Sequence, residues 1–413
     1  MATAPTAPTA EARFRGHLET WCWTMSGTRR TLAGAAIHLG DIPHTTLLMR
    51  TLGTAWTLGG ALALALIASP VRTAHSQGTP LPPMPPGAEY DGEAFAFTRI
   101  ADGVYHAVGT GALAVGANAT IIVNADDVLL VDSHISPAAA WALLKELRRI
   151  TTKPVRYVVN THFHYDHAHG NQVYGPGVEI IGHEFTRAAL LAGASRSSAS
   201  YAGLLRVLQQ RDDSLRRVMR TAAPDSARRA AEGAFRQVQR YRQAIDAVTP
   251  VAPTLTLSQQ MTLIRGGREI RIIFLGRGHT GGDVVVHLPR ERVLVTGDLV
   301  GSGLPYLGDG YIDEWATTLE RLTGLEWDVL LPGHGAPVRD RARPLQLSAL
   351  LRDFHQQATR LLDQGLSVDE AEARIDLSAH VGDYPALANR STPDMRERLL
   401  LGLYRIRELR QSR

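Results

Sequence analysis

Four residues with strong metal-binding side chains lie within six positions, and they constrain the fold more than any other feature. The chain reads NTHFHYDHAHG from residue 160, which places His162, His164, Asp166 and His167 directly after a short apolar run. In an extended or turning loop, the two histidines at alternate positions point to one side, while the pair past the bend can serve a neighbouring position. One metal ion could not easily use all four side chains. The spacing therefore predicts two metal positions at the end of a buried strand.

Three further potential ligands each follow an apolar run later in the chain. His279 lies in the glycine-rich segment GRGHTGGD, Asp298 ends the segment VLVTGD, and His334 lies in the segment LLPGHG. On its own, a histidine or an aspartate after a strand is typically a structural or turn residue. Because α/β proteins place their chemistry where strands end, the shared context of these three residues predicts that they join the first four.

In their order, these segments and VDSH at 131–134 resemble the motifs of the metallo-β-lactamase superfamily. The resemblance runs from about Ile100 to Val338. It implies an α/β fold, an αββα sandwich with the site at the edge between two sheets. The helical patterns outside these motifs add a helical insertion and a helical C-terminus to this expected fold.

The resemblance also implies how the ligands divide between two metal ions. His162, His164 and His279 resemble the ligands of the first ion, Asp166, His167 and His334 those of the second, and Asp298 the carboxylate that bridges both. Asp132 in VDSH resembles a carboxylate that supports the ligands from behind. The aspartate at position 298 is similar to the glyoxalase II and lactonase type, whereas many true β-lactamases carry cysteine or serine there.

Two zinc ions per chain are the expected cofactor, and they define the expected reaction. Two Zn²⁺ ions roughly 3.5 to 4 Å apart lower the pKa of a bridging water from about 15.7 towards 7, which supplies a metal-bound hydroxide as nucleophile. Asp166, if bound through one oxygen, would orient the hydroxide and pass its proton to the leaving group. We therefore expect a metal-dependent hydrolase that cleaves an ester, lactone or cyclic amide of a small-molecule substrate, with β-lactamase-like activity among these.

The same ligand set also fits iron, which leaves a second class of function open. Iron occupies such sites in persulfide dioxygenases and flavodiiron proteins. The chain has no attached flavin-binding domain, which disfavours the second of these. The alternative is therefore an iron-dependent oxidoreductase of the persulfide dioxygenase type.

The first ninety residues have the pattern of an exported protein. The apolar run GGALALALIA follows Met49-Arg50, and Ala74-His75-Ser76 has the small residues of a signal-peptidase site. We expect residues 1–48 to be a non-native N-terminal extension, 49–76 a signal peptide and 77–90 a Pro-rich linker. The rival interpretation is a twin-arginine signal at Arg29-Arg30. Either signal would make the protein periplasmic or secreted, and the apolar run is too short to leave a stable membrane span.

The remaining chain divides into a main domain and two helical parts. Residues 91–343 carry the ligands and alternate between strand and helix patterns, except for a helical insertion at 184–248. Residues 344–413 are helical again. Because both ends of the insertion emerge close to the ligands, we expect it to form a substrate-selecting cap, and a dimerisation arm is the alternative.

Composition removes several other classes of function. The only cysteine, Cys22, lies in the expected extension, which excludes disulfides, thiolate catalysis and cysteine-ligated zinc sites from the mature chain. The formal net charge is +4, and most of that excess lies before residue 77. The near-neutral remainder gives no reason to expect a nucleic-acid partner.

The first prediction concerns export. The mature protein should begin at Gln77 or within a few residues of it, because signal peptidases cleave after small residues that follow an apolar segment. N-terminal sequencing of protein recovered from the cell envelope measures this directly. Recovery of residues 1–48 in that sample would contradict both the expected extension and the cleavage site.

Overall fold

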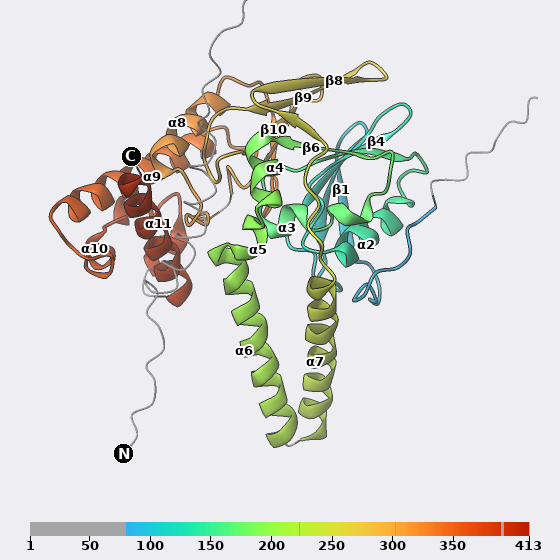
Figure 1. Ribbon diagram of the computed structural model, residues 1–413, viewed down its shortest axis with the longest axis horizontal. Helices are drawn as coiled ribbons and strands as arrows, with labels where there is room; N and C mark the ends of the chain where they lie inside the picture. Colours follow the sequence, from blue (N-terminus) through green and yellow to red (C-terminus); the bar gives the residue numbers. More distant parts are fainter. Residues whose placement is uncertain (1–79, 223, 302, 390–391, 413) are drawn as a thin grey trace, which may run out of the picture. The chain divides into compact units, whose positions relative to one another are not determined.

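The computed structural model of the chain describes residues 80–222, 224–301, 303–389 and 392–412 (Figure 1). The expected extension at 1–48 and signal peptide at 49–76 lie outside the described residues. Within the described part of the chain, no helix is long and apolar enough to cross a membrane.

Two β-sheets form the centre of the fold. The seven-stranded sheet has the order β1-β2-β3-β4-β5-β6-β7, and the five-stranded sheet has the order β12-β11-β10-β9-β8. The strands of the first sheet are β1 (Phe95–Ala101), β2 (Val104–Gly109), β3 (Ala119–Val123), β4 (Val128–Val131), β5 (Val155–Val159), β6 (Glu179–His183) and β7 (Leu255–Leu257). Those of the second are β8 (Gln260–Arg265), β9 (Arg268–Phe274), β10 (Val284–Leu288), β11 (Val293–Gly297) and β12 (Val329–Pro332).

Alternation along the strands explains why the sheets stack. Successive side chains of a strand point to opposite faces. In β4, Leu130 joins the apolar cluster that includes residues of helix α2, whereas Leu129 joins a second cluster with Ile272 and Val293 of the other sheet. Both faces of the seven-stranded sheet are therefore apolar, one against a helix and the other against the second sheet. This arrangement is the predicted αββα sandwich, with both sheets in its interior.

Helices cover the sandwich and extend the chain beyond it. The first, α2 (Pro137–Leu147), begins at Ser136, whose side chain accepts a hydrogen bond from the backbone N–H of Ala139, as expected for an N-cap. The others are α3 (Tyr165–Ala168), α4 (Glu184–Leu191), α5 (Ala194–Ser197), α6 (Ala199–Thr221), α7 (Asp225–Asp246), α8 (Ile312–Leu322), α9 (Arg343–Asp363), α10 (Val368–Arg374) and α11 (Pro393–Gln411). The short 3₁₀ helices are η1 (Asn171–Val173), η2 (Ser378–His380) and η3 (Pro385–Asn389).

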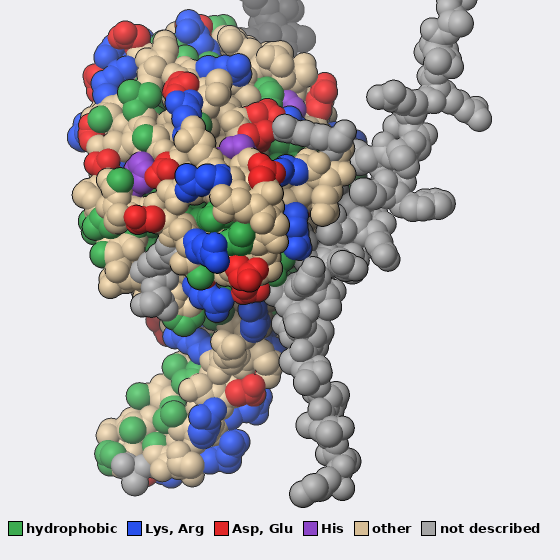
Figure 2. All heavy atoms as spheres, turned by 90° about the vertical axis from the view of Figure 1, so that its left-hand side faces the viewer, with side chains coloured by type: hydrophobic (Ala, Val, Ile, Leu, Met, Phe, Trp, Pro, Cys, Tyr) green, Lys and Arg blue, Asp and Glu red, His purple; other side chains and the backbone are tan. Residues whose placement is uncertain are grey.

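The insertion between β6 and β7 contains α4 to α7, and α6 and α7 lie side by side as a long hairpin (Figure 1). Buried Asp212 on α6 helps to hold the pair, because it accepts hydrogen bonds from Arg216 on its own helix and from Gln239 on α7. Arginine side chains gather on the surface of this hairpin (Figure 2).

The described part of the Pro-rich stretch, residues 80–90, contacts helix α2. Trp141 donates a hydrogen bond from Nε1 to the carbonyl of Pro82 at 2.9 Å, and the Tyr90 hydroxyl donates to Glu146 at 2.8 Å. Ala88 is buried in the same cluster as Trp141. Residues 80–90 therefore pack against the folded domain and do not form the separate Pro-rich linker expected from the sequence. They supply hydrogen-bond partners for polar groups on the side chains of α2.

Candidate metal centre

Four segments bring the candidate ligands to one edge of the sandwich. Helix α3 and its preceding loop follow the end of β5, and Asp298 directly follows β11. His334 lies two residues after β12, while His279 lies in the loop that follows β9. Strands β11 and β12 are parallel neighbours, so their carboxyl ends meet at the same edge. All seven residues predicted from the sequence are brought together.

Three buried histidines form the first cluster. The Nδ1 atom of His164 lies 3.1 Å from Nε2 of His162 and 3.0 Å from Nε2 of His279. Burial, followed by the neighbouring histidines, lowers the pKa of His162 well below its usual value, and burial lowers that of His279 to about 3. Three ring nitrogens that face one another suit a tetrahedral metal ion, which binds imidazole well and leaves a fourth position open in catalytic sites.

The second cluster combines a carboxylate with two histidines. Asp166 Oδ2 lies 3.1 Å from Nε2 of His334 and 3.7 Å from Nε2 of His167. His167 is fully buried, whereas the His334 side chain is 49% exposed and therefore faces the solvent side of the site. In this cluster, as in the first, one possible ligand atom from each of the three residues lies within 4.8 Å of the other two. The three side chains are therefore close enough to bind one metal ion together.

Asp298 lies between the two clusters. Its Oδ1 atom is 3.3 Å from Nε2 of His167, and its Oδ2 atom is 3.5 Å from Nε2 of His279. Both His167 Nε2 and Asp298 Oδ1 are buried and lack a partner with hydrogen-bond geometry among the described residues. A pair of buried polar atoms without hydrogen bonds is unfavourable, and a metal ion would satisfy both. The residues therefore fit a dinuclear centre that Asp298 bridges.

Buried Asp132 supports the cluster from behind and sets the tautomer of His167. The backbone of Asp132 has φ 66°, a left-handed conformation uncommon for a non-glycine residue. Its Oδ1 atom accepts from the backbone N–H of Thr161 at 2.8 Å, and its Oδ2 atom accepts from Nδ1 of His167 at 2.8 Å. His167 is thereby left with Nε2 directed at the two acidic ligands.

Asp309 performs the same task for His164, and sequence reasoning missed it. His164 donates from Nε2 to Asp309 Oδ2 at 3.0 Å, which leaves Nδ1 free to face the other histidines. Asp309 lies 145 residues from His164 in the chain, in a loop between β11 and α8. No spacing pattern links the two residues, so only the fold reveals the contact.

Gly333 is required by the close packing of the ligands. A Cβ atom at this position would lie 2.3 Å from Asp298 Oδ1 and 2.7 Å from Cε1 of His167. Neither ligand can move away without losing its place in the cluster. The glycine beside His334 therefore allows the end of β12 to approach the site closely.

Other histidines and tyrosines near the ligands have separate roles. His134, His169 and His183 lie outside the clusters, and each has a hydrogen-bonding partner: Ala117, Ser195 and Phe185 respectively. Tyr306 lies beside His164, with 5.6 Å between ring centres, and lines the cleft above the ligands. Tyr311 instead contacts Arg277 and Arg405.

A cleft of about 810 Å³ opens onto the ligands. Its walls come from the first turns of α6, the loop residues 300–301 and 303–306, and the start of α11. Arg206 on α6 and Glu397 on α11 form an ion pair at 3.3 Å, so the insertion and the C-terminal helices meet beside the site. The cleft has the size of a small-molecule site, for which volumes of roughly 300 to 1,000 Å³ are typical.

A family model described as the metallo-beta-lactamase superfamily matches residues 112–334. A linear primary-alkylsulfatase of Pseudomonas sp. (strain ATCC 19151) is 26% identical over 298 residues, which are 66% of this chain and 51% of that protein. The 2,4-dinitroanisole O-demethylase subunit alpha of Nocardioides sp. (strain JS1661) is 24% identical over 224 residues, 53% of each chain. The chain thus spans about half the length of these two relatives.

Two further similarities either cover a shorter segment of the chain or are lower in sequence identity. A metallo-beta-lactamase type 2 of Bacillus cereus is 33% identical over 93 residues, which are 21% of this chain and 36% of that protein. Among solved structures, the metallo-beta-lactamase from Pontibacter korlensis has a TM-score of 0.45 and 20% identity, and the similarity covers 62% of this chain and 99% of that one.

The second prediction tests the supporting role of Asp309. Replacing Asp309 with alanine should weaken zinc binding by about 10- to 100-fold, because His164 loses the partner that orients its ring. Competition with a chromogenic chelator measures the affinity. Asp394→Ala is the matched control, since Asp394 lines the same cleft but pairs with Arg398. Equal affinities for the Asp309→Ala variant and the unmodified protein would show that the contact does not support the site.

The third prediction concerns the histidine protons that are released when zinc binds. The carboxylate of Asp298 is the main influence that raises the pKa of His334, to about 10. Burial lowers the pKa of His167, but the carboxylates of Asp298, Asp132 and Asp166 together hold that pKa well above its usual value. Both rings are therefore protonated in metal-free protein at neutral pH. Since a metal ligand must be deprotonated, zinc loading at pH 7 should release on the order of two histidine protons per chain.

Calorimetric titration in two buffers of different ionisation enthalpy measures this release. The contribution of His334 should disappear as the pH rises through about 10, because the ring is then already neutral. Zinc binding at pH 7 with no transfer of protons to the buffer would contradict the assignment of His167 and His334 as ligands.

Proposed function

Since the chain belongs to the metallo-β-lactamase superfamily, we propose that it is a hydrolase that acts on a small molecule at a pair of zinc ions. The observation that carries the proposal is the position of Asp298, whose carboxylate lies within 3.5 Å of histidines from both clusters: His279 of the first, and His167 and His334 of the second. When bound, two such ions would activate water as the nucleophile and polarise the bond to be cleaved. The superfamily includes the sulfatase and β-lactamases to which this chain is similar, and these support hydrolysis as the reaction type.

The residues of the chain itself divide the remaining work. His162, His164 and His279 would hold one ion and Asp166, His167 and His334 a second, and Asp298 lies within reach of both sets of ligands. Asp166 lies at the floor of the cleft, where its carboxylate is placed to accept a proton and return it to the leaving group. The buried hydrogen bonds of Asp132 and Asp309 fix the ligand rings before substrate arrives, so little reorganisation is needed during the reaction.

The walls of the cleft are suited to select the substrate. The first turns of α6 contribute Arg206 and Val207, and α11 contributes Arg398 and Leu401. Arg206 pairs with Glu397, and Arg398 pairs with Asp394, so the charges of these walls are balanced. Such a lining of apolar and paired polar groups favours a substrate with an apolar part and a polar part. We therefore propose that the start of the insertion acts as a substrate-selecting wall, and that the bond cleaved belongs to an ester, lactone or cyclic amide.

A redox function is the second candidate, because histidine and carboxylate ligands also suit iron. The same histidine and carboxylate side chains would therefore also serve an iron-dependent oxidoreductase of the persulfide dioxygenase type. Metal content separates the two, since each metal implies a different reaction.

The fourth prediction tests the proposed function. Natively purified protein should contain close to two zinc ions per chain and hydrolyse at least one member of a panel of aryl esters, lactones, β-lactams and alkyl sulfates. In both His162→Ala and Asp298→Ala variants, metal content and activity should fall together, with activity reduced by about 100-fold or more because each removes a ligand. Elemental analysis and initial rates measure the two effects.

His380→Ala is the matched control, because His380 pairs with Asp353 outside both clusters and should retain metal and rate. Iron as the only bound metal would favour the oxidoreductase instead. A fully active Asp298→Ala enzyme would remove the bridging role on which the proposal depends.

A further inference from the structure

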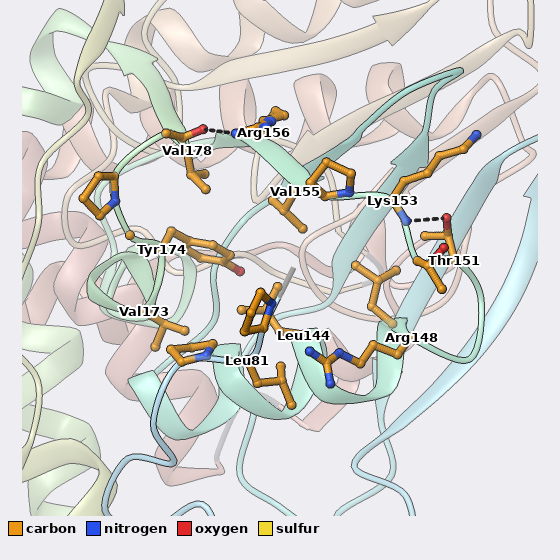
Figure 3. A pocket seen from close by; sticks show the side chains of 18 residues that line it. Leu81, Leu144, Arg148, Thr151, Lys153, Val155, Arg156, Val173, Tyr174 and Val178 are labelled. Carbon is orange, nitrogen blue, oxygen red and sulfur yellow. Dashed lines mark hydrogen bonds between the residues drawn. The ribbon is translucent and has the colours of Figure 1, made fainter. Parts of the chain in front are cut away.

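A second cavity lies at the opposite end of β5 from the candidate metal centre. Val155, the first residue of this strand, lines the cavity, whereas the ligand loop begins just after its last residue. The cavity has a volume of about 440 Å³ and is enclosed by α2, the segment before β5 and the loop between η1 and β6 (Figure 3). This volume lies within the range of small-molecule sites, roughly 300 to 1,000 Å³.

The interior of the cavity is mainly aliphatic. Its apolar lining comes from elements far apart in the sequence: Leu81, Leu144, Leu147, Val155, Val173 and Val178. Such a surface offers no hydrogen bonds from its side chains and favours contact with a hydrocarbon chain over contact with water.

One polar group is buried in this lining without a partner. The Tyr174 side chain is 9% exposed, and its hydroxyl has no hydrogen-bond partner among the described residues. Figure 3 shows the hydroxyl directed into the space between Leu144 and Val155. Burial raises the pKa of Tyr174, so the hydroxyl keeps its proton and is available as a donor. Because buried hydroxyls are nearly always hydrogen-bonded, this one points to an acceptor supplied by a ligand.

The charged residues that line the cavity are all basic. Arg148, Lys153 and Arg156 line the cavity, and no acidic residue is among its described lining residues. Lys153 donates from Nζ to the carbonyl of Asn124 at 2.6 Å, and Arg156 donates to that of Gly177 at 3.4 Å. These acceptors are neutral and cancel neither charge, but the contact with Asn124 turns the Lys153 side chain away from Tyr174 (Figure 3). The guanidinium of Arg148 extends toward Leu81 (Figure 3).

We propose that this cavity is a second ligand site, which binds a single-chain aliphatic carboxylate. The hydrocarbon chain lies among the leucine and valine side chains. The carboxylate accepts a hydrogen bond from the Tyr174 hydroxyl and is attracted by the cationic rim, which is defined here as the two lining arginines, Arg148 and Arg156. The proposal is independent of the reaction at the metal centre, since none of these residues lines the cleft that opens onto the metal ligands.

The fifth prediction tests this site with decanoate as the probe and the full-length, metal-loaded protein. Isothermal titration should detect decanoate binding, and decanol should bind at least about 10-fold more weakly because it lacks the charge attracted by the rim. Tyr174→Phe should weaken decanoate binding by about 10-fold or more, because it removes one hydrogen bond to a charged group. Tyr384→Phe is the matched control, since that variant removes another buried, unpartnered hydroxyl outside the cavity and should bind decanoate normally.

A second variant blocks the cavity itself. Val178 is half-buried at the cavity wall, where it packs at the edge of the core, so Val178→Trp should fill the space and abolish decanoate binding. Rates of substrate hydrolysis, measured in parallel, should be unchanged in both cavity variants. Equal decanoate affinity in the unmodified protein, Tyr174→Phe and Val178→Trp would place the probe elsewhere and overturn the proposal. Absence of decanoate binding, or equal affinity for decanol, would also overturn it.

Discussion

The convergence of seven polar side chains at one edge of an apolar sandwich, with four of the histidines buried, is the constraint on which the rest of the structure depends. Transfer of an unpaired charge into a protein interior costs several kcal/mol, so such groups must be paired or must bind a metal ion. Here the carboxylates of Asp166 and Asp298 face the histidines directly. Asp132 and Asp309 satisfy the outer nitrogens of His167 and His164, which leaves the inner nitrogens for the cluster.

The same constraint explains local features that would otherwise be unfavourable. Asp132 adopts a left-handed backbone conformation, which allows one carboxylate to reach both the backbone of Thr161 and the ring of His167. Gly333 leaves room for Asp298 because it has no side chain. The strained backbone of Asp132 and the glycine at position 333 each bring a ligand into place, which explains why these locally unfavourable features occur at this edge.

Strand β5 connects two environments with different chemistry. Its carboxyl end leads into the histidine-rich loop, whereas its amino end borders an aliphatic cavity with a cationic rim. In parallel sheets the loops at the carboxyl ends converge, and they supply most of the polar side chains. The opposite end is enclosed by α2 and the loop before β6, which supply mainly apolar groups. The helical insertion and α11 then complete the walls of the metal cleft.

The sequence by itself determined the seven-residue cluster, because ligand spacing is a local property of the chain, and its resemblance to the metallo-β-lactamase superfamily implied the sandwich. His162 to His167 occupy one loop, and the remaining three ligands each follow an apolar run that forms a strand. Only the tertiary structure decided which distant groups support them. Asp309 reaches His164, Arg206 meets Glu397, and Tyr174 enters a cavity beside Leu81, although nothing in their spacing links these residues. Such contacts depend on how the helices and loops pack in space, and that packing has no periodic signal in the sequence.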